Sequence, residues 1–165
     1  RMRIFAIDPG NARSAYVGWD TDTEGILCKG IDDNWDILCM MHNKALAYDY
    51  DILAVEMVAS YGMPVGATVF DTCVWIGRFL ELWEIEAMSA PSETSLVYRK
   101  DVKMNLCKTM RAKDGNVRQA LIDRFGEPGT KKNPGKLYGV KKDIWSALAI
   151  AVTYADTSKS NDHKK

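Results

Sequence analysis

The chain has 165 residues, which corresponds to one domain with a core of ordinary size. Hydrophobic residues make up 47% and charged residues 27%, a balance that excludes wholesale disorder. No apolar run approaches the ~20 residues that cross a bilayer, and the chain opens directly into a strand pattern rather than a signal peptide. The four cysteines lack the close pairs of a zinc site, so we expect reduced thiols in a cytoplasmic protein.

The charges are segregated along the chain although they cancel overall, with 22 basic and 22 acidic residues. Residues 1–98 contain 6 Lys and Arg against 15 Asp and Glu, whereas residues 99–142 contain 13 against 4. A basic surface gains free energy by displacing counterions from phosphates, so this segregation favours a polyanion as partner. The alternative is that folding mixes the two segments in space and leaves no patch.

The first half of the chain predicts a sheet that begins with a meander. Strands are expected at Met2–Asp8, Ala15–Asp20 and Gly25–Gly30, and the short connections between them make the pairing antiparallel. Apolar residues at helical spacing predict a helix over Asp33–Tyr48. The strand at Asp51–Glu56 follows that helix, so we expect it to run parallel to the first strand.

The second half is predicted to alternate helices and strands. In chain order we expect a loop at Gly62–Gly66, a helix at Thr68–Glu81, a strand at Trp83–Ala87, helices at Tyr98–Lys108 and Lys113–Phe125, a lysine-bearing loop at Glu127–Tyr138, and an apolar helix at Asp143–Asp156. This order predicts a single α/β domain over residues 2–157 with a mixed sheet, three antiparallel strands and then parallel ones, flanked by helices. A polar tail follows at residues 158–165.

Two acids end hydrophobic strands. Asp8 closes IFAID before a Pro-Gly turn, and Glu56 closes AVE. If the two strands are adjacent and parallel, with a spacing of about 4.8 Å, both carboxylates reach one hard cation. The alternatives are a turn-initiating aspartate that bonds its own backbone and a surface glutamate.

A third acid, Asp143, precedes the last helix, where the alternative interpretation is an N-cap. That helix is too apolar to be exposed, so it packs on the sheet and brings Asp143 toward the other two acids. Three converging carboxylates repel one another unless a metal joins them. Oxygen ligands of this kind favour Mg²⁺ or Mn²⁺, and a phosphate substrate can complete the coordination.

These motifs together resemble a known family. FAIDPG, AVE and K-x-D-x-x-x-ALAIA resemble the RuvC-type Holliday-junction resolvases of the ribonuclease H-like nuclease superfamily. YGMPVGATVFDTCVWIGRF and RAKDGNVRQALIDRFG are similar to the phage and prophage branch. The resemblance covers residues 2–156 and implies a ribonuclease H-like sheet. It also implies a homodimeric, Mg²⁺-dependent endonuclease that cuts four-way DNA junctions, with Mn²⁺ as a substitute for Mg²⁺. The expected location is the cytoplasm, which is that of the bacterial host if the chain is phage-encoded.

The resemblance also assigns roles, with one departure. It implies that Asp8 bridges two metals and that Glu56 and Asp143 complete the site. The family commonly has a second aspartate directly before ALAIA, and this chain has Ser146 there, on the same helix face as Asp143. The serine leaves three alternatives open. The site works with three acids, or Asp71 or another nearby acid replaces the missing aspartate, or metal binding at the site is weakened.

The remaining candidates would contact DNA. Lys142 and Lys141 flank Asp143 and could neutralise the scissile phosphate, with solvated lysines as the alternative. Tyr61 and Met63, in the loop after Glu56, could stack on junction bases, or they pack on the domain. The basic residues expected to bind backbone phosphates are Arg99, Lys100, Lys103, Lys108, Arg111, Lys113, Lys131 and Lys132.

Two other functions remain open from the sequence. The same carboxylates would serve a ribonuclease acting on structured RNA, and the serine at 146 is compatible with a catalytically weak junction-binding protein.

Overall fold

A computed structural model describes the backbone of residues 1–162 and the side chains of residues 1–159. Its centre is one five-stranded sheet in the order β3-β2-β1-β4-β5. The strands are β1 (Arg3–Asp8), β2 (Arg13–Asp20), β3 (Gly25–Asp33), β4 (Ile52–Met57) and β5 (Glu93–Tyr98). The first three pair antiparallel, and β4 and β5 run parallel to β1. The predicted mixed sheet is therefore confirmed.

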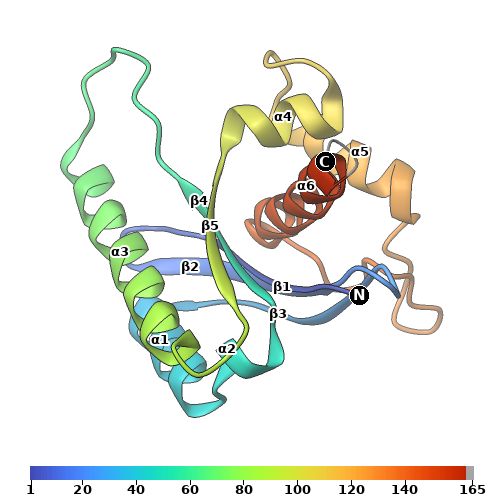
Figure 1. Cartoon of the computed structure of the whole chain (residues 1–165). Coiled ribbons are helices and arrows are strands. Elements are labelled where there is room, and N and C mark those ends of the chain that lie inside the picture. The colour runs from blue at the N-terminus through green and yellow to red at the C-terminus, as the bar shows by residue number, and fades with distance from the viewer. Residues whose placement is uncertain (163–165) are drawn as a thin grey trace.

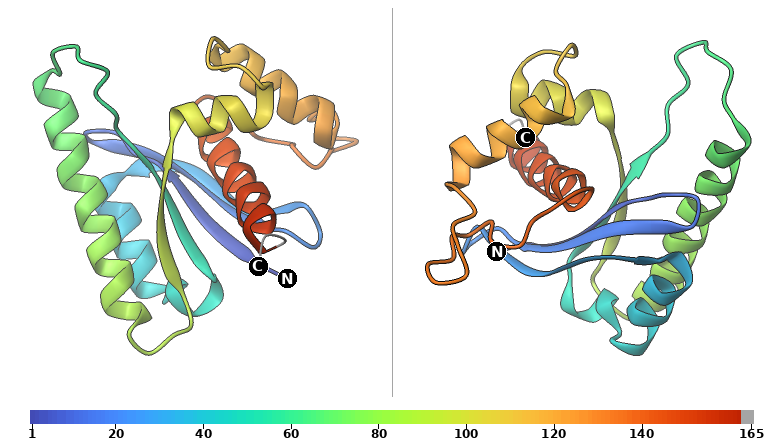
Figure 2. Two further views of the ribbon diagram at one scale, coloured as in Figure 1. Left: turned by 45° about the horizontal axis from the view of Figure 1, so that its top comes forward. Right: turned by 180° about the vertical axis from the view of Figure 1, so that it is seen from behind.

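Helices cover both faces of the sheet (Figures 1 and 2). One face carries α1 (Asn34–Asn43), α2 (Leu46–Asp49) and α3 (Ala67–Ala87). The other face carries α4 (Arg99–Cys107), α5 (Asp114–Phe125) and α6 (Ile144–Asp162). The basic segment thus forms one side of the molecule, where α4 and α5 pack against each other and on α6.

Side-chain alternation along the central strand builds two hydrophobic cores. In β1, Ile4 and Ala6 point to the α6 side, whereas Phe5 and Ile7 point to the α3 side. Both cores are needed because a parallel strand is buried on its two faces, which explains the continuous apolar run IFAI.

The last helix is apolar because it packs directly on the sheet. Ala147, Ala149 and Ala151 are fully buried, and their small side chains let the helix axis approach β1 and β2.

None of the described helices, α6 included, combines the length and hydropathy needed to cross a bilayer.

One predicted strand is wrong. Trp83–Ala87 forms the end of α3, and the fifth strand is Glu93–Tyr98 instead. The helix continues because Ile76, Phe79 and Trp83 all face the core at helical spacing, and burial of the Trp83 ring outweighs the local alternation of its neighbours.

Two other boundaries differ from the predictions. The helix expected over Asp33–Tyr48 is divided into α1 and α2 at Ala45, whose φ of 48° lies in the left-handed region. At the other end, α6 continues through the expected polar tail to Asp162, and residues 163–165 lie outside the described residues.

Candidate active site

The structure places Asp8 and Glu56 side by side. Strands β1 and β4 are adjacent and parallel, with Ile7 opposite Val55, so the next residues of the two strands meet at the same edge of the sheet. Both side chains are half-buried. The predicted adjacency of the two strands is confirmed.

Burial and mutual repulsion favour retention of a proton by the Asp8–Glu56 pair. Burial raises the pKa of Asp8 to about 8, and the negative charges of Glu56 and Asp143, together with a hydrogen bond that the Asp8 carboxyl donates to Glu56, add to this rise. Burial also raises the pKa of Glu56, while the Arg99 guanidinium opposes the rise at both acids. A cation placed at this pair would therefore displace a proton and gain two buried oxygen ligands.

A buried hydrogen-bond network fixes the turn that follows Asp8. The Ser14 hydroxyl donates to Oδ1 of Asn34 at 2.5 Å and accepts from the Gly10 N–H at 3.1 Å. Asn34 in turn donates to the Gly10 carbonyl at 2.9 Å. Ser14 and Asn34 were missed from the sequence because they are 20 residues apart, and only the pairing of β2 with β3 brings them together.

Asp143 lines a cavity together with Asp8. It is exposed and immediately precedes α6, and the cavity has a volume of about 680 Å³. Four cationic side chains also line this cavity: Arg13, Lys29, Lys141 and Lys142. The structure thus brings the two expected lysines beside the acids.

Arg13 and Lys29 are additions that the sequence did not suggest. They come from the acidic half of the chain, on β2 and β3, and the antiparallel meander carries them to the cavity. No local signal in the sequence could have found them, since their contribution depends on the fold of the meander around Asp8.

In the part of the chain that the structure describes, no three His, Cys, Asp or Glu side chains are grouped closely enough to hold a metal ion. Asp8 and Glu56 form a hydrogen-bonded pair, and Asp143 lines one cavity together with Asp8. The donor set nevertheless fits a hard divalent cation, because it consists of carboxylate oxygens whose mutual repulsion a cation would relieve.

The environment of Ser146 contains a nearby acid other than Asp71. Ser146 and Asp143 line a second cavity of about 350 Å³, together with Arg99 and Asp114. Asp71, which the sequence offered as a compensating acid, is exposed on α3. The additional acid beside Ser146 is Asp114, the first residue of α5.

The predicted base-stacking loop lies next to the acid pair. Tyr61 and Met63 are 66% and 75% exposed in the connection between β4 and α3. Tyr61 lines a third cavity, of about 290 Å³, with Asp8, Glu56 and Arg99. Tyr61 is therefore accessible to a ligand beside Asp8 and Glu56, whereas Met63 is exposed and does not line this cavity.

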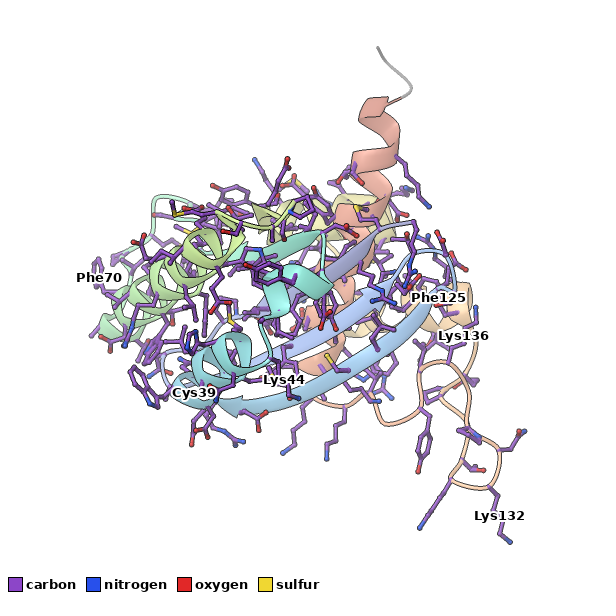
Figure 3. The ribbon with its side chains drawn as sticks, turned by 60° about the horizontal axis from the view of Figure 1, so that its bottom comes forward. Cys39, Lys44, Phe70, Phe125, Lys132 and Lys136 are labelled. Atoms are coloured by element: carbon purple, nitrogen blue, oxygen red, sulfur yellow. The ribbon has the colours of Figure 1, made fainter. Side chains whose placement is uncertain are left out.

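The predicted phosphate-binding residues fall into two groups. The first group lies on or between α4 and α5 and comprises Arg99, Lys100, Lys103, Lys108, Arg111 and Lys113. Most of these side chains are exposed, whereas Arg99 and Lys103 are half-buried. The second group, Lys131 and Lys132, lies on a loop that projects away from the sheet (Figure 3). The structure does not place that loop among the residues lining the acid cavity.

Solved structures of known proteins share the fold of this chain, although the sequence comparisons find no match. No protein-family model matches the chain, and no curated protein sequence matches it. Among solved structures, Thermus thermophilus RuvC is similar with a TM-score of 0.66 at 18% identity, over 97% of each chain. T. thermophilus RuvC in complex with Holliday junction substrate gives 0.64 at 17% identity, over 97% of this chain and 96% of that one.

A eukaryotic structure agrees with these matches. The yeast mitochondrial Holliday junction resolvase gives a TM-score of 0.59 at 12% identity, over 93% of this chain and 78% of its own. At sequence identities this low, the structural matches establish the fold alone. They agree with the strand order and the two helical layers described above. The chain therefore has the ribonuclease H-like fold of the RuvC-type Holliday junction resolvases.

Proposed function

We propose that the chain is a divalent-metal-dependent endonuclease that resolves four-way DNA junctions. The observation that carries this proposal is the cavity of about 680 Å³, which Asp8 and Asp143 line together with four Arg and Lys side chains. Carboxylates suit a metal, and a ring of cations suits phosphates, so one cavity offers both halves of phosphodiester hydrolysis. The structural similarity to a RuvC bound to a Holliday junction supports branched DNA as the substrate.

The roles of the residues follow from their positions. Asp8, Glu56 and Asp143 would hold Mg²⁺, or Mn²⁺ in its place, and the bound cation would activate a water and stabilise the leaving oxygen. Lys142 and Lys141 would neutralise the scissile phosphate from the Asp143 side of the cavity. Lys142 is held there by a backbone φ of 47°, a left-handed turn directly before Asp143.

A gel assay on three substrates tests the proposal. We expect a synthetic four-way DNA junction to be cut in Mg²⁺ and in Mn²⁺, but not in EDTA, while linear duplex DNA stays intact. Cleavage of structured RNA alone would instead identify a ribonuclease, and retarded junction mobility without product would identify a binding protein. Either result would refute the proposal.

We expect DNA binding to depend on the cations that line the cavity, both the predicted Lys141 and Lys29, which the structure adds. Each phosphate contact contributes roughly −0.9 to the slope of log affinity against log salt concentration. Replacing Lys29 and Lys141 by Gln together should therefore flatten the slope by about 1.8. Fluorescence anisotropy in an Asp8→Asn background measures this without cutting the DNA.

The matched control for this measurement is Lys44→Gln, which removes one exposed charge at the end of α1, on the other face of the sheet. Its slope should equal that of the parent. An unchanged slope in the Lys29 and Lys141 variant would show that the DNA backbone follows another surface.

The expected homodimer has a candidate surface on α1 and α3. Trp35 and Val74 are 58% and 61% exposed there and line an apolar groove of about 530 Å³ between the two helices. Arg78 lies over the Trp35 and Trp75 rings, with its guanidinium 5.1 Å and 4.2 Å from their centroids. Exposed apolar patches of this kind mark interaction surfaces. A junction needs two cuts, and a second copy of the chain would supply the second site.

Val74→Glu should dissociate this dimer, because a charge in the middle of an apolar interface is left without a partner. We expect the dimer dissociation constant to rise by roughly a hundredfold in sedimentation velocity experiments. Leu27→Glu, at a 46% exposed apolar position on β3, is the control and should sediment like the parent. Identical sedimentation of the Val74 variant and the parent would rule out this face.

The cellular location and the lineage stay predictions. All four cysteines are unpaired, as a reducing cytoplasm favours. The phage and prophage branch rests on the resemblance of sequence motifs alone.

A further inference from the structure

Arg99 stands between the two carboxylate sites. It is the first residue of α4, directly after β5, and β5 is the neighbour of the strand that carries Glu56. One side of Arg99 lines the cavity that contains Asp8 and Glu56. The other side lines the cavity that contains Asp143 and Asp114. Arg99 therefore lines both of the cavities that contain the acids.

Of the two terminal nitrogens of the Arg99 guanidinium, one is hydrogen-bonded and the other is not. Nη2 donates to Oδ1 of Asp114, whose own side chain is 84% exposed. Nη1 is buried and has no hydrogen-bond partner among the described residues. A buried, charged N–H group without an acceptor is energetically unfavourable. The Asp114 carboxylate thus binds Nη2, whereas Nη1 can still donate a hydrogen bond to another acceptor.

The charge of Arg99 acts on the acid pair as a metal ion would. It lowers the pKa of both Asp8 and Glu56, and at Glu56 it is the largest influence that opposes burial. Lys103 contributes in the same direction at Glu56. A divalent cation bound by these carboxylates would lie in the cavity that the same guanidinium lines, and the two positive charges would repel each other.

We propose that Arg99 is the resident counter-cation of the Asp8–Glu56 pair, which competes with the metal, and that Asp114 restrains it from closing on the pair. This inference rests on the proposed metal-dependent function and adds a regulation of that site. In the DNA-free protein, Arg99 weakens metal binding. Asp114, beside the position where the family's usual acid is replaced by Ser146, acts through Arg99 and not as a ligand.

Three variants separate these roles, with Mn²⁺ as the probe and binding to the DNA-free protein measured by electron paramagnetic resonance. Arg99→Gln should bind Mn²⁺ about tenfold more tightly than the parent, because the competing charge is gone. Asp114→Asn should bind it about threefold more weakly, because the freed guanidinium pairs with the acids. The double variant should match Arg99→Gln, since Asp114 has no target once Arg99 is removed.

Each alternative gives a different pattern. If Asp114 were itself a metal ligand, its substitution would weaken binding in the Arg99→Gln background as well, which would overturn the restraining role. Unchanged or weaker Mn²⁺ binding by Arg99→Gln would overturn the counter-cation. Lys44→Gln controls for the loss of one positive charge and should bind Mn²⁺ like the parent.

Two further measurements guard against misreading. Circular dichroism melting shows whether the variants are folded, and Arg99→Lys provides a charge-conserving substitution that should bind Mn²⁺ more weakly than Arg99→Gln. If the parent binds no Mn²⁺ at all, the metal-dependent function fails. If the parent binds Mn²⁺ and the Arg99 variants do not alter the affinity, the function stands and the counter-cation is refuted.

Discussion

Asp8→Asn is expected to reduce junction cleavage by roughly 10³-fold or more, because it removes the carboxylate that is central to the proposed metal site. Asparagine keeps the size of the side chain and lacks its charge, so the turn at Gly10 should survive through the Ser14 and Asn34 hydrogen bonds. Junction binding should stay equal or become tighter, since one negative charge fewer faces the phosphates. Single-turnover cleavage and a gel-shift titration on the same junction measure the two quantities.

A matched control is Asp49→Asn, at an exposed aspartate in α2 on the opposite face of the sheet. It removes the same charge at a distance from the cavity and should cut at the parent's rate. Undiminished cleavage by Asp8→Asn would place the active site elsewhere. A parallel loss of binding and cleavage would indicate that Asp8 supports the fold rather than the reaction.

The central part of this site could be predicted from the sequence because each signal is local. IFAID and ILAVE are buried runs that end in acids, and a helix between them makes the two strands parallel. The apolar composition of the last helix likewise required it to lie on the sheet, with Asp143 at its start. These inferences needed no knowledge of contacts between distant residues.

The rest of the site depends on distant contacts, which a single sequence does not display. Lys29 reaches the cavity only through the meander, and Arg99 was expected to bind DNA backbone phosphates, with no sequence signal that placed it beside the acids. Asp114 was not considered as the acid near Ser146, because 31 residues of helix and loop separate the two positions along the chain. The error at Trp83 has a related cause, since burial against Phe5 of β1 decided between helix and strand.

The metal-free protein is expected to lose stability as the pH rises from about 4 to about 8. The folded-state pKa of Asp8 is raised to about 8, above its ordinary value of 3.8, by burial, by Glu56 on β4 and by Asp143 before α6, with Arg99 on α4 in opposition. Between these two values the folded state holds a proton that the unfolded chain has released. The free energy of unfolding therefore falls as the pH rises across this window.

Urea denaturation at several pH values, in the parent and in Asp8→Asn, measures this contribution. The variant has no proton to lose at this position, so its stability should change less between pH 4 and pH 8 and should exceed that of the parent at pH 8. Adding Mg²⁺ at pH 8 should stabilise the parent, because the ion binds the folded carboxylates, and should stabilise the variant less. Equal pH slopes in the two proteins would show that the Asp8 carboxyl is not held protonated. The Asp8–Glu56 pair would then lower the stability of the metal-free protein and raise that of the metal-bound protein, as is common for groups held in an unfavourable state at a functional site.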